Sequence, residues 1–444
     1  MEKRSADTLI HARWIIPVSG NERFLDHHSV AIRDGDIIDI LPTARAREVY
    51  EAVKHTSLDN HVLIPGLINT HTHAAMSLFR GLADDLPLMT WLNEHIWPAE
   101  QRWIGEQFVT DGARLAIAEM IRSGTTCFND MYFFADVTGR VAAQAGMRAV
   151  VGEVLYDFPS PNYGPIEDGF RYTEMLIDKW RDDPLITIAV EPHSPYLCAP
   201  DLLRKAARLA TAHAIPLVIH VSETASEVRT IRERHGASPV QHLADLNVLG
   251  PNLLACHCVA LDATDMDLLG THHVKVVHNP ESNMKLASGI APVPDLLARG
   301  ICVALGTDGC ASNNNLDLFQ AMDITAKLHK VHDMDPTAAD ARTVLEMATR
   351  EGAQAIGMGT EIGSLEVGKK ADLIIVDIHK PHLVPLYHPA SLLVYAAKGS
   401  DVQTVIVDGH LVVENGSLVH LDLAEIMHRT NLVARRISQE EKPL

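Results

Sequence analysis

The chain has 444 residues, of which 47% are hydrophobic and 21% charged, a length and composition that allow a large folded core. No apolar run reaches the ~18 residues of a membrane-spanning helix, which excludes insertion into a membrane. With 38 basic and 57 acidic residues the net charge is −19, and this charge would repel nucleic acid and anionic membrane surfaces. We expect neither as a partner.

Residues 1–20 lack the apolar segment of a secretory signal, since their apolar run covers only residues 14–18. We therefore expect a cytoplasmic protein. Six cysteines are too few to build a disulfide scaffold in so long a chain, and most stand in apolar runs where cysteine packs as a small hydrophobic residue. We expect reduced thiols.

The first predicted element is a β-hairpin near the N-terminus. Residues 29–33 and 36–41 are rich in valine, isoleucine and leucine and flank the dipeptide Asp34-Gly35. Both positions of such a turn tolerate the positive φ angles that a tight hairpin requires. This segment predicts one half of a small β unit.

Further along, short apolar strands alternate with amphipathic helical stretches such as residues 111–123 and 200–213, a pattern typical of a parallel sheet covered by helices. Eight strands are predicted, at residues 62–70, 125–129, 149–155, 186–191, 216–221, 253–259, 274–279 and 301–306. Eight strands with eight crossovers over about 300 residues fit a (β/α)8 TIM barrel. The alternative is an open doubly wound sheet, which would place a glycine-rich turn after its first strand, where residues 70–73 read Thr-His-Thr-His.

A second hairpin is predicted near the C-terminus, where residues 402–407 and 410–414 flank Asp408-Gly409 and residues 371–376 supply a further strand. We expect the β segments of the two termini to pair. The predicted fold is therefore α/β, with residues 63–361 as the barrel and residues 1–62 and 362–444 as a composite small β-sandwich domain.

Polar residues stand at the predicted C-terminal strand ends, where a barrel gathers its catalytic side chains. They are His71, His73, Asn129, Asp130, His193, His220, His257, His278, Asn279 and Asp308. Side chains two apart on a strand share a side, so His71 and His73 can face one ion while Thr72 points away. His220 and Asp308 would complete three nitrogens and one oxygen with a position left for water, as in a catalytic zinc site.

Other interpretations of these residues remain open at this point. With 25 histidines in the chain, a single His-x-His pair is more often a surface or core feature than a metal site. Asp308 precedes a glycine and suits an ordinary turn, and the sulfurs of Cys256 and Cys258 are predicted to face away from His257. The joint pattern at strands one, five and eight favours the metal.

Several motifs make the chain resemble the amidohydrolase superfamily: Pro65-Gly-Leu-Ile-Asn-Thr-His-Thr-His73, His220-Val-Ser-Glu223, His257 and Gly306-Thr-Asp-Gly309. Others make it most similar to the 5′-methylthioadenosine/S-adenosylhomocysteine deaminases in the deaminase and triazine-hydrolase branch: residues 73–81, 91–100, 192–195 and 278–286. Residues 363–372 resemble the segment by which this family returns from the barrel to its β domain. The likeness covers nearly the whole chain.

The resemblance implies one Zn²⁺ per subunit, with Fe²⁺ or Mn²⁺ as substitutes, held by His71, His73, His220 and Asp308. Binuclear members carry a bridging modified lysine on strand four, and residues 186–193 contain no lysine. A single metal is therefore expected. The family also implies a homodimer or a higher homo-oligomer.

The expected reaction is hydrolytic deamination of an adenine ring. Asp308 would accept a proton from the attacking water, Glu223 would protonate the ring nitrogen, and His257 would orient the water. Glu223 also suits the ordinary role of an acidic residue at a helix N-terminus. Among further substrate contacts the family implies Glu100 for the ribose hydroxyls, His193 for the nucleoside and Trp91 for the apolar wall near the 5′ substituent.

The 5′ substituent itself is the least determined part of the prediction. Met76, Phe79, Leu86 and Trp91 can wall an apolar pocket or belong to ordinary core, and Arg171 can clamp a carboxylate or face solvent. We expect 5′-methylthioadenosine to be a better substrate than adenosine or S-adenosylhomocysteine. The rival hypotheses are an aminohydrolase or chlorohydrolase of the same branch, acting on guanine, pterin or triazine rings, and a metal-binding barrel without catalysis.

Overall fold

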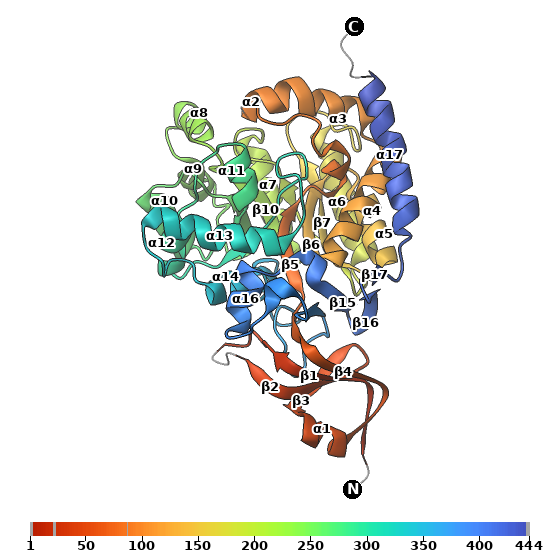
Figure 1. Cartoon of the computed structure of the whole chain (residues 1–444). Coiled ribbons are helices and arrows are strands. Elements are labelled where there is room, and N and C mark those ends of the chain that lie inside the picture. Colours follow the sequence, from red (N-terminus) through yellow and green to blue (C-terminus); the bar gives the residue numbers. More distant parts are fainter. Residues whose placement is uncertain (1–2, 21–23, 87, 441–444) are drawn as a thin grey trace.

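A closed barrel of parallel strands occupies the middle of the chain in the computed structural model, which describes residues 3–20, 24–86 and 88–440 (Figure 1). One run of neighbours is β5 (Leu67–Thr72), β6 (Thr125–Tyr132), β7 (Arg148–Leu155) and β8 (Ile186–Ile188), with β9 (Glu191–Pro192) also beside β7. The other is β10 (Leu217–Val221), β11 (Leu253–His257), β12 (Lys275–His278) and β13 (Val303–Leu305). Backbone bonds join the two runs at both seams, from Val218 N–H to Val190 O and from Asp308 N–H to His71 O, each 3.0 Å. The predicted (β/α)8 barrel is confirmed.

Helices cover the outside of the barrel, and the predicted stretch 200–213 coincides with α7. They are α4 (Glu106–Arg122), α5 (Ala135–Ala145), α6 (Ile166–Trp180), α7 (Pro200–His213), α8 (Ala225–His235), α9 (Pro239–Asp245), α10 (Ala263–Thr271), α11 (Pro280–Lys285), α12 (Val293–Ala298), α13 (Leu318–Asp333), α14 (Ala341–Met347) and α15 (Arg350–Ala355). Their apolar faces and the strands share one large buried core. Within the described residues, no helix is long and apolar enough to cross a membrane.

An excursion after β5 builds one wall of the barrel mouth. It comprises the short helices η1 (Ala74–Phe79), α2 (Leu88–Thr90), η2 (Trp91–Ile96) and α3 (Trp97–Trp103). The η2 segment is a π-helix, a rare form that is frequently found at functional sites. The loop therefore differs from a plain connection between a strand and its helix.

The two termini share one sheet of eight strands, in the order β17-β16-β15-β14-β4-β1-β2-β3. The N-terminal strands are β1 (Arg4–Ile15), β2 (Leu25–Arg33), β3 (Asp36–Pro42) and β4 (Tyr50–Pro65), with α1 (Thr43–Val49) between the last two. The C-terminal strands are β14 (Leu373–Asp377), β15 (Val402–Val407), β16 (His410–Glu414) and β17 (Ser417–Leu418), with η3 (Pro381–Leu383), α16 (Pro389–Tyr395) and η4 (Gly399–Asp401) inserted. Pairing of β14 with β4 joins the halves, as predicted.

Both predicted hairpin turns are present, and their tips touch. Asp34-Gly35 and Asp408-Gly409 all have positive φ angles, as the two-residue turn requires. A Cβ atom on Gly409 would lie only 2.7 Å from the Cα of Gly35, so glycine is needed for the close approach. The N–H of Ala371 donates to Gly35 O at 2.8 Å, and Gly409 N–H donates to Ala371 O at 3.1 Å. The turns thus help to hold the two termini together.

The prediction of one strand over residues 62–70 is wrong. This segment contains the end of β4 and most of β5, which belong to different sheets. The chain changes direction at Gly66, whose N–H donates to Asp372 O at 3.0 Å. The predicted strand over 186–191 is likewise divided into β8 and β9, and β4 stays paired with β14 as far as Pro65.

The last helix, α17 (Leu423–Glu440), lies along the side of the barrel and not on the terminal sheet (Figure 1). Its Arg429 donates through Nε to Oδ1 of Asp111 on α4, at 2.8 Å. Asp111 is buried, so this ion pair is shielded from solvent on one side. The final segment of the chain thereby reinforces the barrel wall.

Candidate active site

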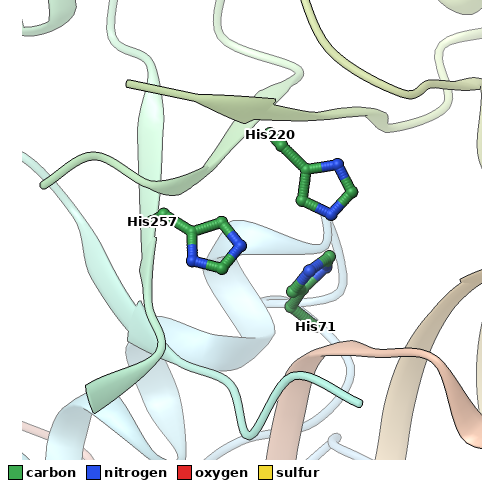
Figure 2. Close-up of side chains that lie close together, drawn as sticks. All are labelled: His71, His220 and His257. Atoms are coloured by element: carbon green, nitrogen blue, oxygen red, sulfur yellow. The ribbon is translucent and has the colours of Figure 1, made fainter. Parts of the chain in front are cut away.

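Five predicted strand-end residues form one buried cluster at the C-terminal mouth of the barrel. One ligand atom from each of His71, His220 and His257 lies within 4.8 Å of the others, and His71 forms a second such group with His73 and Asp308. Figure 2 shows the three rings of the first group pointing toward one another from separate strands. The predicted ligands His71, His73, His220 and Asp308 therefore lie together, and His257 stands beside them.

Strand alternation and one glycine explain how the cluster assembles. Thr72 donates to Asn129 O at 2.8 Å, so its side chain points toward β6 while its neighbours face the mouth. At the eighth strand, a Cβ atom on Gly306 would lie 2.4 Å from Asn279 Oδ1 and 2.9 Å from His71 Cβ. Only glycine allows β13 to bring Asp308 this close to His71.

Hydrogen bonds fix three of the rings and leave one nitrogen of each facing the centre. The Nδ1 atoms of His73 and His220 lie 2.5 Å from Met131 O and 2.7 Å from His193 O. His257 Nδ1 lies 2.9 Å from Asn283 Oδ1. Each oxygen is an acceptor, so each Nδ1 donates a proton and each Nε2 is left facing the cluster. This is the arrangement in which histidine binds a metal.

His71 is the centre of the cluster and the least satisfied of its members. The side chain is fully buried, and neither ring nitrogen has a hydrogen-bond partner. Its Nε2 lies 3.5 Å from Asp308 Oδ1, to which His73 Nε2 approaches at 3.2 Å. Buried polar atoms are normally paired, so this orphaned imidazole fits a bound cation.

Charges in the cluster also favour a cation. Burial, and then the neighbouring histidines, hold the pKa of His220 well below its usual range, so the ring is neutral as a ligand must be. Burial lowers the pKa of His73 too, but the hydrogen bond and charge of Asp308 outweigh it and raise that pKa to about 9. Asp308 stays ionised, because its contact with His73 and the charges of the other rings overcome the effect of burial on its pKa.

The two oxygens of Asp308 have different surroundings. Oδ1 faces the histidines and accepts the N–H of Gly309 at 2.8 Å. Oδ2 accepts two hydroxyl groups, from Ser282 at 2.6 Å and from Ser312 at 2.8 Å. The sequence analysis assigned a role to neither serine; Ser282 lies on the short helix α11 and Ser312 in the turn after Asp308.

Left-handed backbone angles are concentrated at these strand ends. Ser222, His257, Cys258 and Asp308 have φ angles of 52°, 74°, 48° and 62° although none is glycine. Such conformations cost on the order of 1–3 kcal/mol each and persist where surrounding contacts enforce them. Three strands thus turn sharply just where they deliver polar side chains.

Cys256 and Cys258 are buried, and the candidate metal groups in the described residues contain neither.

A cavity of about 440 Å³ opens directly above the cluster. His73, His220, His257 and Asp308 contribute to its floor. The other predicted site residues also line it, namely Trp91, Glu100, His193 and Glu223. The predicted metal ligands, together with Glu223, His257, Glu100, His193 and Trp91, therefore all lie in the cluster or at this one cavity.

Glu223 and Glu100 are two acids held in this apolar cavity. Burial raises the pKa of Glu223 above its usual range, which favours a form that can donate a proton. Burial likewise raises the pKa of Glu100 to about 7, against a hydrogen bond that Tyr132 donates to its Oε1 at 2.8 Å. The same effect in the opposite direction lowers the pKa of His193 to about 3, so that ring is neutral.

The predicted apolar pocket is partly wrong. Met76 and Trp91 line the cavity, but Phe79 does not, because its ring packs 4.9 Å from that of Phe108 in the core. Leu86 is half-buried outside the lining. The aromatic walls that sequence reasoning missed come from the end of β6 and from the loops after β6, β7 and β9: Tyr132, Phe133, Tyr156, Phe158 and Tyr196.

Arg171 does not serve as a clamp in this structure. It lies on α6, its side chain is 71% exposed, and it pairs with Asp168 three residues earlier on the same helix. None of the described residues lining the cavity is a lysine or an arginine. A buried carboxylate in this cavity would therefore find no such partner.

Comparisons with known proteins agree with this geometry. The 5-methylthioadenosine/S-adenosylhomocysteine deaminase of Syntrophobacter fumaroxidans is 56% identical over 437 residues, which cover 98% of this chain and 100% of that protein. The crystal structure of an adenosine deaminase from Xanthomonas campestris with bound zinc is 42% identical, with a TM-score of 0.97, and the match covers 99% of this chain and 100% of that one.

A more distant structure shows the same fold. Atrazine chlorohydrolase from Arthrobacter aurescens, complexed with zinc, has a TM-score of 0.90 at 23% identity, over 96% of this chain and 100% of that one. The family model that matches the chain is that of the amidohydrolase family, and it covers residues 62–412. The cluster, the barrel and these matches lead to one conclusion: the chain belongs to the amidohydrolase family and is a metal-dependent hydrolase of the deaminase type.

Proposed function

We propose that this protein removes the 6-amino group of 5′-methylthioadenosine by hydrolysis, giving ammonia and the corresponding inosine analogue, with one zinc ion per chain. One observation carries the proposal: residues of the His–Asp cluster line the same cavity as Glu223 and Glu100. The relative at 56% identity has a name that includes this activity.

The residues of the cluster fit a zinc ion. His71, His73 and His220 would give three nitrogens and Asp308 one oxygen, a donor set that suits zinc and also accepts Fe²⁺ or Mn²⁺. The unpartnered nitrogens of His71 support this assignment. When bound, the ion lowers the pKa of a water molecule toward ~7 and supplies a nucleophile at neutral pH.

Two carboxyl groups that line the cavity carry the proton transfers. Glu223, whose pKa burial raises, donates to the ring nitrogen next to the carbon that bears the amino group. Asp308 takes one proton of the attacking water and passes it to the amino group, which leaves as ammonia, while the remaining hydroxyl proton restores the acid form of Glu223. Asp308 Oδ2 already accepts two serine hydroxyls, so one hydroxyl must turn away, or pass the proton on, when the water is deprotonated. His257 orients the water from the side of β11.

Substrate selection follows from the remaining walls of the cavity. Glu100 accepts the vicinal ribose hydroxyls, His193 contacts the nucleoside, and Trp91 borders the 5′ substituent. The absence of lysine and arginine from the described lining favours an uncharged 5′ group. Adenosine and S-adenosylhomocysteine are then poorer substrates than 5′-methylthioadenosine, because one lacks the apolar group and the other brings an unpartnered carboxylate.

Ammonia release from a panel of nucleosides and heterocycles tests the proposal. We expect the highest kcat/KM for 5′-methylthioadenosine, and none for guanine, a pterin or a chlorinated triazine. Turnover of one of the heterocycles alone would replace the proposal with another activity of the branch, and no turnover of any compound by zinc-loaded protein would favour a barrel without catalysis.

We also propose that the chain is cytoplasmic and forms a homodimer or higher homo-oligomer. The resemblance to its family supports this state. A monomer in light scattering at assay concentration would contradict it.

A further inference from the structure

A second buried glutamate, Glu227, contacts the backbone that carries the proposed acid. Its carboxylate accepts two backbone N–H groups, that of Ser222 at 2.9 Å through Oε1 and that of Glu223 at 2.7 Å through Oε2. The residue is 7% exposed. Because a carboxylate only accepts hydrogen bonds, both oxygens suit two N–H donors, which no amide side chain could match.

These bonds take the place of the return bond in a capping box at the start of α8. Glu227 is the third residue of α8, and Thr224 at its N-cap accepts the Glu227 N–H at 3.1 Å. In a capping box, the glutamate at this position would bond back to the N–H of the capping threonine. Here the carboxylate reaches further back, to the turn that precedes the cap. A residue in the first turn of α8 therefore stabilises the preceding Ser222–Glu223 turn.

The turn needs such support. Ser222 has a φ angle of 52°, a conformation that is costly for a residue with a Cβ atom. Its carbonyl accepts the N–H groups of Val259 and Ala260 at 3.0 and 2.9 Å, in the loop that follows His257. Glu227 thus fixes the N–H side of the turn while the loop after β11 fixes the carbonyl side.

The geometry assigns Glu227 as a positioning residue, which acts through the Ser222–Glu223 backbone to hold the Glu223 carboxyl group above the metal-binding cluster. This inference rests on the proposed function, since it takes Glu223 as the proton donor. Glu227 itself is absent from the cavity lining. It therefore contributes to turnover without touching the substrate.

A double-mutant cycle between the two glutamates is the test. Glu227→Gln places an NH₂ group against a backbone N–H, and a displacement of Glu223 by about 1 Å should lower kcat ~10- to 100-fold with little change in KM. In the Glu223→Gln background, measured in single turnover with excess enzyme, the same substitution should cost less than about twofold, because the group it positions is already lost. Zinc content should be unchanged.

Thr224→Ala is the matched control, since it weakens the start of the same helix but leaves both bonds of Glu227 in place. It should retain kcat within about twofold. An equal loss from Glu227→Gln in both backgrounds, or a kcat within threefold of the parent, would overturn the inference. If Glu227→Gln does not fold, the cycle is repeated with Glu227→Asp, which keeps the charge on a shorter side chain, and the same non-additivity is expected.

Amide hydrogen exchange separates this inference from the proposed function. Exchange in residues 221–224 should become faster in Glu227→Gln than in Thr224→Ala, whatever the substrate is. Unchanged exchange would show that Glu227 does not hold the turn. A parent protein without deaminase activity would instead refute the proposed function. The exchange rates would still show whether Glu227 holds the turn.

Discussion

Buried polar groups lie at both ends of the barrel strands, and the two ends use them differently. At the start of β7, Arg148 donates through Nε and Nη2 to Asp372 at 2.9 and 3.1 Å, and through Nη1 to Pro184 O at 2.7 Å. Asp372 also accepts the N–H of Asp408. At the opposite ends, His71 is just as deeply buried with both nitrogens unpartnered.

This contrast separates a structural joint from a binding centre. Arg148 and Asp372 connect the barrel to the terminal sheet, and their hydrogen-bonding groups are used by the protein itself. The histidine cluster brings ring nitrogens together and leaves those of His71 without hydrogen-bond partners. Such an arrangement is unfavourable without a ligand, and the surrounding fold holds it in place. Substitutions in the histidine cluster should therefore lower activity and spare stability, and substitutions at Arg148 or Asp372 should lower stability and spare activity.

The largest functional effect is expected from His71→Ala. Loss of the central ligand should abolish both metal binding and turnover while the protein stays folded, because the change relieves an unsatisfied buried group. Elemental analysis and ammonia release measure the two losses. His213→Ala, which changes an exposed residue at the end of α7, is the control and should retain both. Two metals per parent chain, or full activity without metal, would contradict the single-ion site.

Glu223→Gln should separate metal binding from proton transfer. The amide preserves the shape of the side chain but cannot supply a proton, so kcat should fall by ~10²- to 10⁴-fold with the metal retained. Zinc content and steady-state kinetics are the measurements. Activity within about tenfold of the parent would refute the assignment of Glu223 as the acid.

At the structural joint, Asp372→Asn should produce the reverse result. Arg148 would remain buried without its carboxylate, which typically destabilises a protein by ~3–5 kcal/mol. Chemical denaturation should show this loss, while kcat of the folded protein stays near that of the parent. The control is Asp178→Asn, which breaks an exposed ion pair with Arg181 and should cost less than about 1 kcal/mol. Equal costs at the two sites would remove the distinction between them.

A smaller effect is expected from the ionisation of Glu100. Burial raises its pKa to about 7, so the carboxylate becomes protonated, and loses an acceptor for ribose hydroxyls, as the pH falls below about 7. kcat/KM for 5′-methylthioadenosine should then decline roughly tenfold per pH unit below that value. The decline should disappear in Glu100→Gln and with a 2′,3′-dideoxy analogue. Its persistence in both would assign it to another group.

Sequence reasoning succeeded where the fold leaves few choices. The ends of parallel strands must meet at one mouth, so the positions of His71, His220 and Asp308 followed once the strands were recognised. Sequence reasoning failed where packing between distant segments determines which residues line the cavity. The aromatic walls Tyr156 and Phe158 stand in a loop without periodicity, and their stacked rings, 3.8 Å apart, belong to the cavity only through tertiary folding.

The same reasoning explains two smaller departures from prediction. The hairpin turns at Asp34 and Asp408 were predictable because turn chemistry is local, but their contact with each other is not encoded in either segment. The docking of α17 on α4 includes the pair between Arg429 and Asp111, residues far apart in the chain. Local patterns therefore predict elements and strand ends better than they predict neighbours.

The smallest effect is expected at Arg171. It allows an exposed ion pair to be compared with a buried one. Its ion pair with Asp168 is exposed, and such pairs contribute about 0–1 kcal/mol, in contrast to the buried pair of Arg148. Because Arg171 lies outside the cavity lining, Arg171→Ala should change kcat/KM for S-adenosylhomocysteine and for 5′-methylthioadenosine by the same factor, less than about twofold. Steady-state kinetics with both substrates measure this ratio. A selective loss for S-adenosylhomocysteine would mean that α6 approaches the bound substrate in solution, and that the uncharged lining of the cavity does not by itself set the preference for the 5′ substituent.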